Sequence, residues 1–255
     1  MNGSVWKDEQ LVRKFLDGVR GSIPFAKEQI EVMLRLIDAS LKKESVYFID
    51  LGCGDGILSA AILKHYPKAK GILIDFSEPM LTQAKIKLKK YSNQIKFISA
   101  DLGKSEWLSH VKRDNSFNLI VSGFCIHHQT DSRKKELYKE IFRILKPKGM
   151  FINIEHVASS SIWIESRSDD MLIDSLWTFH CAGGGRRTRK EIAHEFVHRP
   201  DKKANILARV DDQCSWLRKI GFEDVDCYFK SFELAVFGGR KPRTKVYQKN
   251  RRIPI

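Results

Sequence analysis

The chain has 255 residues, of which 42% are hydrophobic and 30% charged, a balance typical of a globular protein with one sizeable core. It carries a net charge of +14, no apolar run long enough to cross a bilayer, and no basic-then-apolar secretory signal, so we expect a cytoplasmic protein without a transmembrane segment. Its five cysteines are scattered and include no C-x-x-C pair, which disfavours disulfides and a zinc site and predicts no metal.

Two helical patterns open the chain. Residues 6–19 and residues 25–41 each repeat apolar side chains at the three- and four-residue spacing of an amphipathic helix. Gly21 and Pro24 separate the two patterns. We therefore expect residues 1–45 to form a helical cap at the N-terminus.

Strands and helices then alternate up to residue 155. Each expected strand is a short apolar run, and each expected helix has one apolar face. The strands are expected at 46–51, 71–75, 95–99, 117–122 and 150–155. The helices are expected at 56–66, 78–90, 104–111 and 131–145. Repeated β-α-β units of this length predict a doubly wound, mostly parallel α/β sheet.

The rest of the chain departs from this alternation. Residues 157–203 show no strand pattern, and we expect a helical insertion there. A helix is expected at 210–220, followed by two β-rich runs at 225–229 and 232–237. Because a parallel crossover needs a dozen residues or more, the two-residue link between these runs predicts an antiparallel hairpin. The hairpin would complete a seven-stranded sheet.

Three units follow from these patterns. Residues 46–239 would form the main domain, with the insertion at 157–203 as a lid, after the helical cap and before a basic tail at 240–255. The tail has seven Lys and Arg residues and no Asp or Glu, so it supplies half of the net charge. Such a tail can be a solvated terminus, or it can bind phosphate polyanions or an anionic membrane surface.

The most informative segment is the glycine-rich turn after the first strand, Asp50-Leu-Gly52-Cys-Gly54-Asp-Gly56. Glycines after a buried strand let the backbone turn tightly and approach a ligand, and the helix that follows directs free N–H groups to the same place. A dinucleotide-binding fingerprint would need a glycine where Ile57 stands. The turn therefore favours a different nucleotide-like ligand.

Three carboxylates lie at the ends of the first three strands. Asp50 directly precedes the glycine turn, where it would repel a pyrophosphate but suits a ligand with an ammonium group and a sulfonium centre. Asp75 ends the second strand, where an acid can accept hydrogen bonds from ribose hydroxyls, and Asp101 follows the third. Since the carboxyl ends of parallel strands meet at one edge, we expect a shared pocket there. The alternative is that each acid only caps its own loop.

With these residues, the sequence resembles the class I S-adenosylmethionine-dependent methyltransferases, over roughly residues 46–156 and 210–238. The segments that carry the resemblance are Asp50-Leu-Gly-Cys-Gly-Asp-Gly56, Ile74-Asp-Phe-Ser-Glu-Pro-Met80, Ala100-Asp-Leu102, Phe117-Asn-Leu-Ile-Val-Ser122, Leu145-Lys-Pro-Lys-Gly149 and Trp216-Leu-Arg-Lys-Ile-Gly-Phe222. Asn118 and Lys148 depart from the family, which usually has Asp and often Gly at these places, but both lie away from the expected cofactor contacts.

The resemblance implies S-adenosyl-L-methionine as cofactor and S-adenosyl-L-homocysteine as product. The cofactor-binding residues that it implies are Asp50, Gly52, Cys53, Gly54, Asp75, Phe76, Met80, Asp101, Leu102 and Ser122. Among these, Asp50 and Gly52 would face the methionine part and Asp75 the ribose. Asp101 and Leu102 would bind the adenine with Phe76 beside the ring, and Ser122 would line the floor near the sulfonium.

Methyl transfer from a sulfonium is an in-line displacement, so orientation is the main catalytic device, and a base is needed only when the acceptor must lose a proton. His127 and His128 follow the fourth strand, and His156 ends the fifth. In related small-molecule methyltransferases a His-His pair after this strand is common. We take His127 and His156 as candidate bases, with a structural role as the alternative for each. Cys125 is expected to be a packing residue.

The acceptor is not specified by these motifs. A small molecule is expected, and the insertion would help to enclose it with Trp163 and Trp177, while Arg186, Arg187 or Arg189 could pair with an acidic acceptor. These residues can equally be the ordinary core and solvated face of a helical lid. Two alternatives remain: an RNA or protein methyltransferase that uses the basic tail, and a relative that binds the cofactor without methylating.

Overall fold

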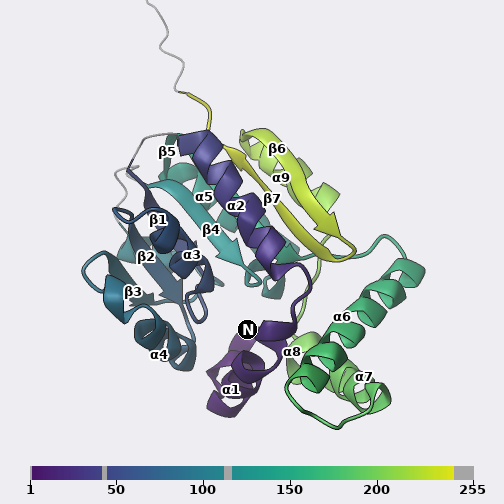
Figure 1. Ribbon diagram of the computed structural model, residues 1–255. Coiled ribbons are helices and arrows are strands. Elements are labelled where there is room, and N and C mark those ends of the chain that lie inside the picture. Colours follow the sequence, from purple (N-terminus) through teal and green to yellow (C-terminus); the bar gives the residue numbers. More distant parts are fainter. Residues whose placement is uncertain (1, 42–44, 112–116, 244–255) are drawn as a thin grey trace, which may run out of the picture.

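Figure 1 shows the computed structural model, which describes residues 2–41, 45–111 and 117–243. A seven-stranded sheet forms its centre, with strand order β3-β2-β1-β4-β5-β7-β6. The strands are β1 Tyr47–Leu51, β2 Lys70–Asp75, β3 Ile95–Ser99, β4 Phe117–Gly123, β5 Leu145–His156, β6 Glu223–Ser231 and β7 Leu234–Arg240. The expected doubly wound, mostly parallel α/β fold with an antiparallel C-terminal hairpin is confirmed.

The direction of the strands determines where a site can lie. β1 to β5 pair in parallel, while β7 runs antiparallel to both β5 and β6. The order reverses at β1, whose neighbours are β2 and β4. In open sheets of this kind, ligands bind beyond the carboxyl ends of the strands at such a reversal.

Helices cover both faces of the sheet. The α-helices are α1 Glu9–Asp17, α2 Ala26–Leu41, α3 Ile57–His65, α4 Glu78–Lys87, α5 Asp131–Ile144, α6 Ile162–Ala182, α7 Arg189–His198, α8 Pro200–Lys203 and α9 Val210–Ile220. Buried residues of β1 alternate between two core clusters, Phe48 on the side of α2 and α3, and Ile49 on the side of α5 and α9. This two-residue alternation of apolar side chains is that of a strand buried on both faces.

The N-terminal region differs from the two simple helices that were expected. A 3₁₀ helix, η1 Asn2–Lys7, precedes α1, because the side chain of Asp8 accepts a hydrogen bond from the Leu11 N–H (2.9 Å) and starts a new helix there. A second 3₁₀ helix, η2 Val19–Ser22, leads toward α2. α2 packs on the face of the sheet, against β5 and β7, rather than over the strand ends.

Two boundaries in the main domain also differ from the expectation. The helix expected at 104–111 is a 3₁₀ helix, η4 Ser105–His110. β5 begins at Leu145, inside the helix expected at 131–145, because Leu145 pairs with Phe117 of β4 before a shift in register. Lys148, with φ of 67°, lies in that irregular stretch, and its N–H donates to the Lys241 carbonyl (2.8 Å).

The C-terminal hairpin is antiparallel, as expected, but its turn is placed differently. β6 extends to Ser231, and the two residues between the strands are Phe232 and Glu233. The strand expected to start at 232 starts at Leu234. This shift places Glu233 at the carboxyl end of β5, beside His156, where it becomes part of the site.

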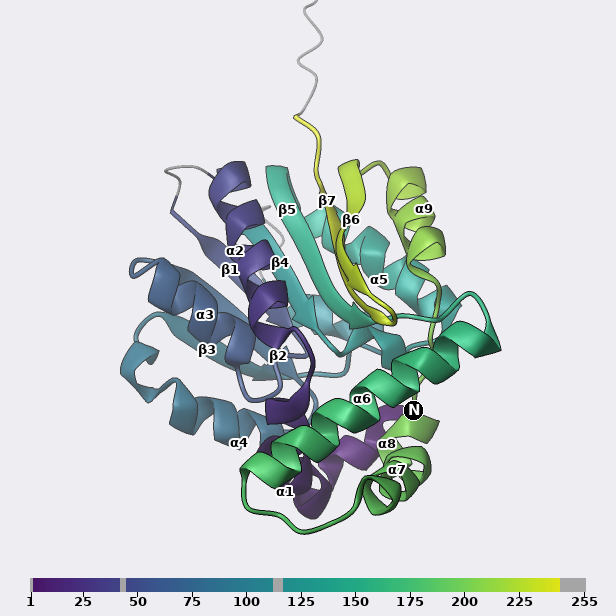
Figure 2. The ribbon, with the colours of Figure 1, turned by 45° about the vertical axis from the view of Figure 1, so that its right-hand side comes forward.

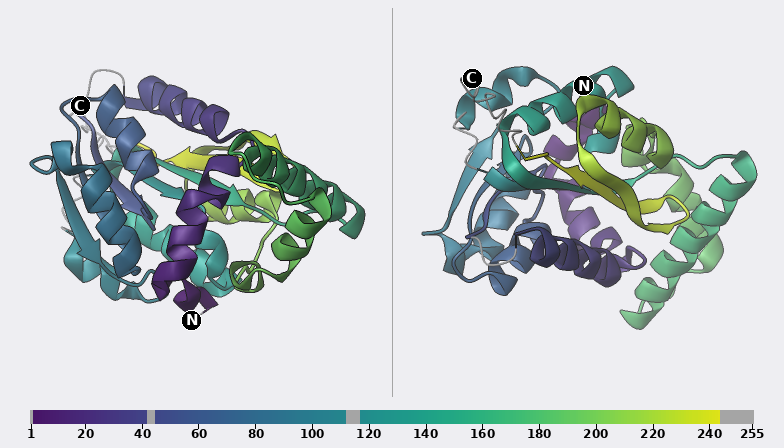
Figure 3. Two further views of the ribbon diagram at one scale, coloured as in Figure 1. Left: turned by 60° about the horizontal axis from the view of Figure 1, so that its bottom comes forward. Right: turned by 90° about the horizontal axis from the view of Figure 1, so that it is seen from above.

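The expected helical insertion is present as α6, α7 and α8. Figure 2 shows α6 crossing below the ends of the central strands, with α7 and α8 beside it. The left view of Figure 3 shows α1, in purple, at the same strand ends as α6. Among the described residues, no helix is both long and apolar enough to span a membrane.

Candidate functional site

The glycine turn after β1 is held by the carboxylate at the end of β2. Gly52, Gly54 and Gly56 all have positive φ, which strains any residue with a Cβ. Asp75 accepts one hydrogen bond from the Gly54 N–H (2.8 Å) and another from the Ser77 N–H (2.9 Å). Burial raises the pKa of Asp75. Asp75 therefore caps the glycine turn and the start of α4. An ionised carboxylate has further lone pairs, so Asp75 can also accept hydrogen bonds from a ligand.

Asp50 is fully buried at the end of β1. Its Oδ2 accepts hydrogen bonds from the hydroxyl (2.6 Å) and the N–H (3.2 Å) of Ser59 in α3. Its Oδ1 is buried and has no hydrogen-bond partner among the described residues. Burial raises the pKa of Asp50 to about 7. A buried acceptor without a donor is costly, so Asp50 Oδ1 is suited to a cationic group of a ligand.

Asp101 repeats this arrangement beyond β3. One carboxylate oxygen accepts from the Gly103 N–H (2.8 Å), and Oδ2 is buried without a partner among the described residues. Two of the three acids thus cap a loop or helix with one oxygen and leave the other unsatisfied. A capping role explains the bonded oxygen of Asp50 and of Asp101, but it does not explain why the second carboxylate oxygen of each is buried without a partner.

Three adjoining spaces lie along this edge of the sheet, and we name each after its acid. The Asp50 compartment and the Asp75 compartment share Arg20 and Phe124 in their walls. The Asp101 compartment joins the Asp75 compartment at Phe76 and His128. Gly52 lines all three compartments, and Cys53 lines the Asp50 and Asp75 compartments. The three form a row whose acids come in turn from β1, β2 and the loop after β3.

Most of the expected cofactor-binding residues meet in these compartments. Gly54 and Met80 line the Asp75 compartment, and Leu102 lines the Asp101 compartment. Ser122 differs: it is fully buried, outside the lining of the three compartments, and its hydroxyl donates to the Leu51 carbonyl (2.9 Å). The structure therefore places Ser122 beneath the floor, where it ties β4 to β1.

Cys125 lies against the glycine turn. A Cβ on Gly52 would come within 2.0 Å of the Cys125 Sγ, so the turn and the loop after β4 fit only with glycine at this position. Burial raises the pKa of the Cys125 thiol well above its usual value. A protonated, packed thiol fits the expected packing role.

A fourth space, the histidine cavity, opens beside the Asp75 compartment. It encloses about 790 Å³, including space open to solvent. Its polar lining comes from the loop after β4, the end of β5 and the insertion. Its lining residues are Trp6, Phe15, Val19, Ser22, Ile23, Phe124, His127, His128, His156, Leu172, Leu176, Phe196, Arg199, Lys202, Asn205 and Leu234. Trp6, Phe15, Phe124 and His128 also line the Asp75 compartment.

His127 forms a buried pair with Glu155. Its Nδ1 lies 2.5 Å from Glu155 Oε1, and the same carboxylate accepts from the N–H groups of His127 (3.1 Å) and His156 (2.9 Å). Among the described residues, His127 Nε2 has no hydrogen-bond partner. A carboxylate on Nδ1 favours the tautomer with the proton on Nδ1, which leaves Nε2 as a basic nitrogen.

His128 is fixed as a neutral imidazole. Its Nε2 lies 3.2 Å from Trp6 Nε1, which can only donate, and its Nδ1 lies 3.3 Å from the Ala204 carbonyl. Burial lowers the pKa of His128 to about 2. With both nitrogens occupied, His128 serves as a wall between the Asp75 compartment and the histidine cavity.

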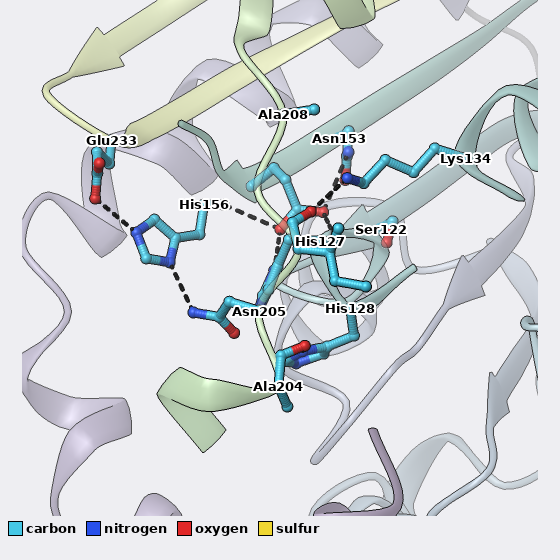
Figure 4. Close-up of polar contacts among 12 residues, drawn as sticks. Ser122, His127, His128, Lys134, Asn153, His156, Ala204, Asn205, Ala208 and Glu233 are labelled. Atoms are coloured by element: carbon cyan, nitrogen blue, oxygen red, sulfur yellow. Dashed lines mark hydrogen bonds and ion pairs between the residues drawn. The ribbon is translucent and has the colours of Figure 1, made fainter. Parts of the chain in front are cut away.

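His156 lies between Glu233 and Asn205, as Figure 4 shows. Its Nε2 is 2.9 Å from Glu233 Oε2, and its Nδ1 is 3.5 Å from the Asn205 side-chain nitrogen. Burial alone would raise the pKa of Glu233, but the hydrogen bonds from His156 and Ser159 outweigh burial, so this pKa is lowered overall. His156 is thus more occupied than His127. Within the described residues, no group of three or more His, Cys, Asp or Glu side chains forms a metal site.

Several residues at the site were not identified from the sequence. Trp6 lines two of the spaces, and its carbonyl accepts from the Ser77 hydroxyl (2.5 Å). Arg20 lines two compartments, and Glu233 pairs with His156. These come from the N-terminal region and the hairpin turn, which carry no motif. Only the tertiary fold brings them to the strand ends.

The charged and aromatic residues of the insertion have mixed positions. Arg187 and Arg189 form ion pairs at the surface with Glu195 and with Asp170 and Asp174. Trp163 is 71% exposed and lies outside the histidine cavity. The arginines and Trp163 therefore fit the ordinary lid face that was the alternative.

The basic tail lies mostly outside the described residues, which end at 243. Its first residue, Arg240, ends β7 and pairs with Asp224 (2.9 Å). The Lys241 N–H donates to the Gly149 carbonyl (2.8 Å). Arg240 belongs to the sheet and Lys241 is bonded to its edge, so the tail begins later than residue 240.

Comparisons with known proteins agree with this geometry. Residues 48–149 match the family model described as a methyltransferase domain. The carboxy-S-adenosyl-L-methionine synthase of Desulfotalea psychrophila is 23% identical over 241 residues, covering 92% of this chain and 91% of its own. The fold resembles that of a protein of Methanococcus maripaludis assigned to the S-adenosylmethionine-dependent methyltransferases (TM-score 0.60, 18% identity, 94% of this chain and 96% of that one). It also resembles human N-acetylserotonin methyltransferase with S-adenosylmethionine (TM-score 0.53, 19% identity, 84% of this chain and 51% of that one).

The fold is that of the Rossmann-like S-adenosylmethionine-dependent methyltransferases. Residues 48–149 match a methyltransferase domain, within a sheet that continues to Arg240.

Proposed function

We propose that the three compartments hold the cofactor in one orientation, with its methionine part beside Asp50, its ribose beside Asp75 and its adenine beside Asp101. The unsatisfied oxygens support this orientation. Asp50 Oδ1 would accept from the α-ammonium group and Asp101 Oδ2 from the exocyclic amine of adenine. Each would gain a donor that the described protein residues do not provide.

Binding of S-adenosylhomocysteine by isothermal titration tests this orientation. In Asp50→Asn and Asp101→Asn, the amide oxygen can keep the existing cap while the amide nitrogen replaces the unsatisfied acceptor. We expect each variant to bind at least about tenfold more weakly, the size of a lost charged hydrogen bond. Asp212→Asn, on α9, makes the same chemical change away from the compartments and should bind like the wild type. Equal affinity in all three variants would overturn the orientation.

We propose a small molecule as the methyl acceptor, bound in the histidine cavity. The walls of this cavity are mainly apolar with a few polar groups among them, which is the lining typical of small-molecule sites. The cavity meets the Asp75 compartment at Phe124 and His128. An acceptor there would lie next to the cofactor. The insertion at 157–203 would act as a lid with residues 2–25, Gly184 (φ 80°) being a candidate hinge.

His127 is the general base in this proposal. The bound cofactor supplies an activated methyl group, so the protein has to orient the acceptor, exclude water and take up any proton that the acceptor loses. His127 Nε2 would take up this proton, because Glu155 occupies Nδ1 and leaves Nε2 as the nitrogen that can accept. His156, held by Glu233 and Asn205, would position the acceptor or the lid instead. A cytoplasmic location is also proposed, since all five cysteines are free.

A second candidate comes from the curated relatives named carboxy-S-adenosyl-L-methionine synthase, which match this chain over about nine tenths of both lengths. The chain would then add a carboxyl group to the cofactor instead of transferring its methyl group. Mass spectrometry of the products separates the two. S-adenosylhomocysteine together with a methylated acceptor supports methyl transfer. In the presence of a carboxyl donor, a cofactor in which a carboxyl group has replaced one hydrogen, and which is heavier by the mass of carbon dioxide, supports the second candidate.

A further inference from the structure

Arg20 of η2 reaches across the glycine turn from the N-terminal region. Its Nη2 donates to Asp55 Oδ1 (2.9 Å), and the guanidinium lines both the Asp50 and the Asp75 compartments. Only 18% of its side chain is exposed. Its Nε is buried and has no hydrogen-bond partner among the described residues. The contact with Asp55 therefore uses only part of the donor capacity of the guanidinium.

Arg20 does not have Asp55 to itself. Asp55 is shared, because Lys87 Nζ binds its other oxygen. Two cations thus face one carboxylate. Asp50, the other acid in this compartment, is directed at Ser59 through one oxygen and lacks a partner on the other. In the Asp50 compartment, the unpaired donor Arg20 Nε therefore accompanies the unpaired acceptor Asp50 Oδ1.

This pairing matches an amino acid head group, which carries an ammonium and a carboxylate on one carbon. We infer that Arg20 binds the α-carboxylate of the methionine part of the cofactor, while Asp50 takes the α-ammonium. The inference rests on the proposed orientation of the cofactor. The planar guanidinium is well suited to a carboxylate, and such charge-assisted hydrogen bonds are stronger than neutral ones.

Arg20 also connects cofactor binding to the acceptor cavity. The segment that carries it, residues 2–25, contributes Trp6, Phe15 and Val19 to the histidine cavity. A cofactor that binds Arg20 therefore fastens the segment that completes the acceptor site.

The test compares two ligands, S-adenosylhomocysteine and its decarboxylated analogue, S-adenosyl-3-thiopropylamine, by isothermal titration. The wild type should prefer S-adenosylhomocysteine by about tenfold or more. Arg20→Gln should bind the two with similar affinity, and Arg20→Lys should keep part of the preference. Lys87→Gln is the matched control, because it removes the other cation on Asp55 without lining a compartment, and it should keep the full preference.

A second measurement follows the segment itself. Arg13 is exposed on α1, so trypsin can cut there when the segment opens. S-adenosylhomocysteine should slow this cleavage in the wild type more than the decarboxylated analogue does. An unchanged ligand preference in Arg20→Gln would overturn the role of Arg20 alone. Failure of the wild type to bind S-adenosylhomocysteine would overturn the cofactor orientation as well.

Discussion

The cofactor compartments and the histidine cavity lie side by side but are built in different ways. Each acid of the compartments directly ends or follows a strand, and the glycine turn adjoins the first of them. The histidine cavity is assembled from the N-terminal region, the loop after β4, the end of β5, the insertion with the residues that follow it, and the start of β7. A site made of strand ends is fixed as soon as the sheet forms. A site made of five segments depends on how they pack.

Because the two regions are separate, we expect cofactor binding to depend on the compartments and catalysis on the histidine cavity. The largest expected effect of a substitution is at His127. In His127→Asn, the amide nitrogen can still donate to Glu155, but the basic Nε2 is lost. We expect kcat to fall about 100- to 10,000-fold for an acceptor that must lose a proton, the usual contribution of a general base. Affinity for S-adenosylhomocysteine should not change.

His128→Asn is the control for that prediction. His128 is neutral and has both nitrogens occupied, so its loss should affect packing and KM more than kcat. A fall in kcat that is equal in both variants would remove His127 from the role of base.

The two regions also differ in how far they could be predicted from the sequence. Asp50, Asp75 and Asp101 were found because each lies next to a strand pattern, and the structure brings them to one edge. Glu155, Glu233 and Trp6 were not, because the local sequence does not show which distant side chains will meet at a histidine.

The errors in the expected elements have similar causes. The end of α5 was placed one residue too late, because Leu145 is apolar and fits both a helix and the strand that pairs with Phe117. The break at Asp8 was missed, since the apolar pattern continues through the cap. Ser122 matched a motif, but its hydroxyl is directed to the Leu51 carbonyl. Pattern alone gives the position of a residue in a strand and does not give the partner of its side chain.

A smaller effect is expected from a substitution that couples the two regions at the glycine turn. Gly52 and Gly54 both have positive φ, so alanine is strained at either place, at a cost of about 1–2 kcal/mol. At Gly52, the new Cβ would also overlap Cys125, whereas at Gly54 the nearest atom is Met80 Sδ at 3.9 Å. We therefore expect Gly52→Ala to lower the free energy of unfolding by about 2–4 kcal/mol, and Gly54→Ala by about 1–2 kcal/mol. Denaturant titration measures both.

Partial rescue of Gly52→Ala by Cys125→Gly would show that the overlap, and not backbone strain alone, is responsible. Equal losses in the two alanine variants would contradict the close contact between the turn and the loop after β4.

Binding of the cofactor should depend on pH through Asp50. Its pKa is raised by burial to about 7, so in the free protein the carboxyl group is mostly protonated below pH 7 and mostly ionised above it. If the ionised form binds the α-ammonium, affinity for S-adenosylhomocysteine should fall by up to about tenfold per pH unit below pH 7. Titrations from pH 5.5 to 8, with Asp50→Asn showing a flatter profile, check this. An identical profile in the variant would assign the dependence to another group.

The smallest effect is expected at the end of the chain, where the alternative of an RNA acceptor can be tested. The truncation should follow Arg243. Arg240 pairs with Asp224 and Lys241 bonds to Gly149, so a cut at the start of the expected tail would remove contacts with the sheet. Removal of residues 244–255 takes away four basic residues, Lys245, Lys249, Arg251 and Arg252. For a small acceptor in the histidine cavity, kcat/KM should not change. A protein that uses the tail on RNA would instead lose affinity, and its dependence on salt would weaken in proportion to the phosphate contacts removed. A salt-dependent loss of RNA methylation on truncation would therefore move the acceptor from the cavity to the surface.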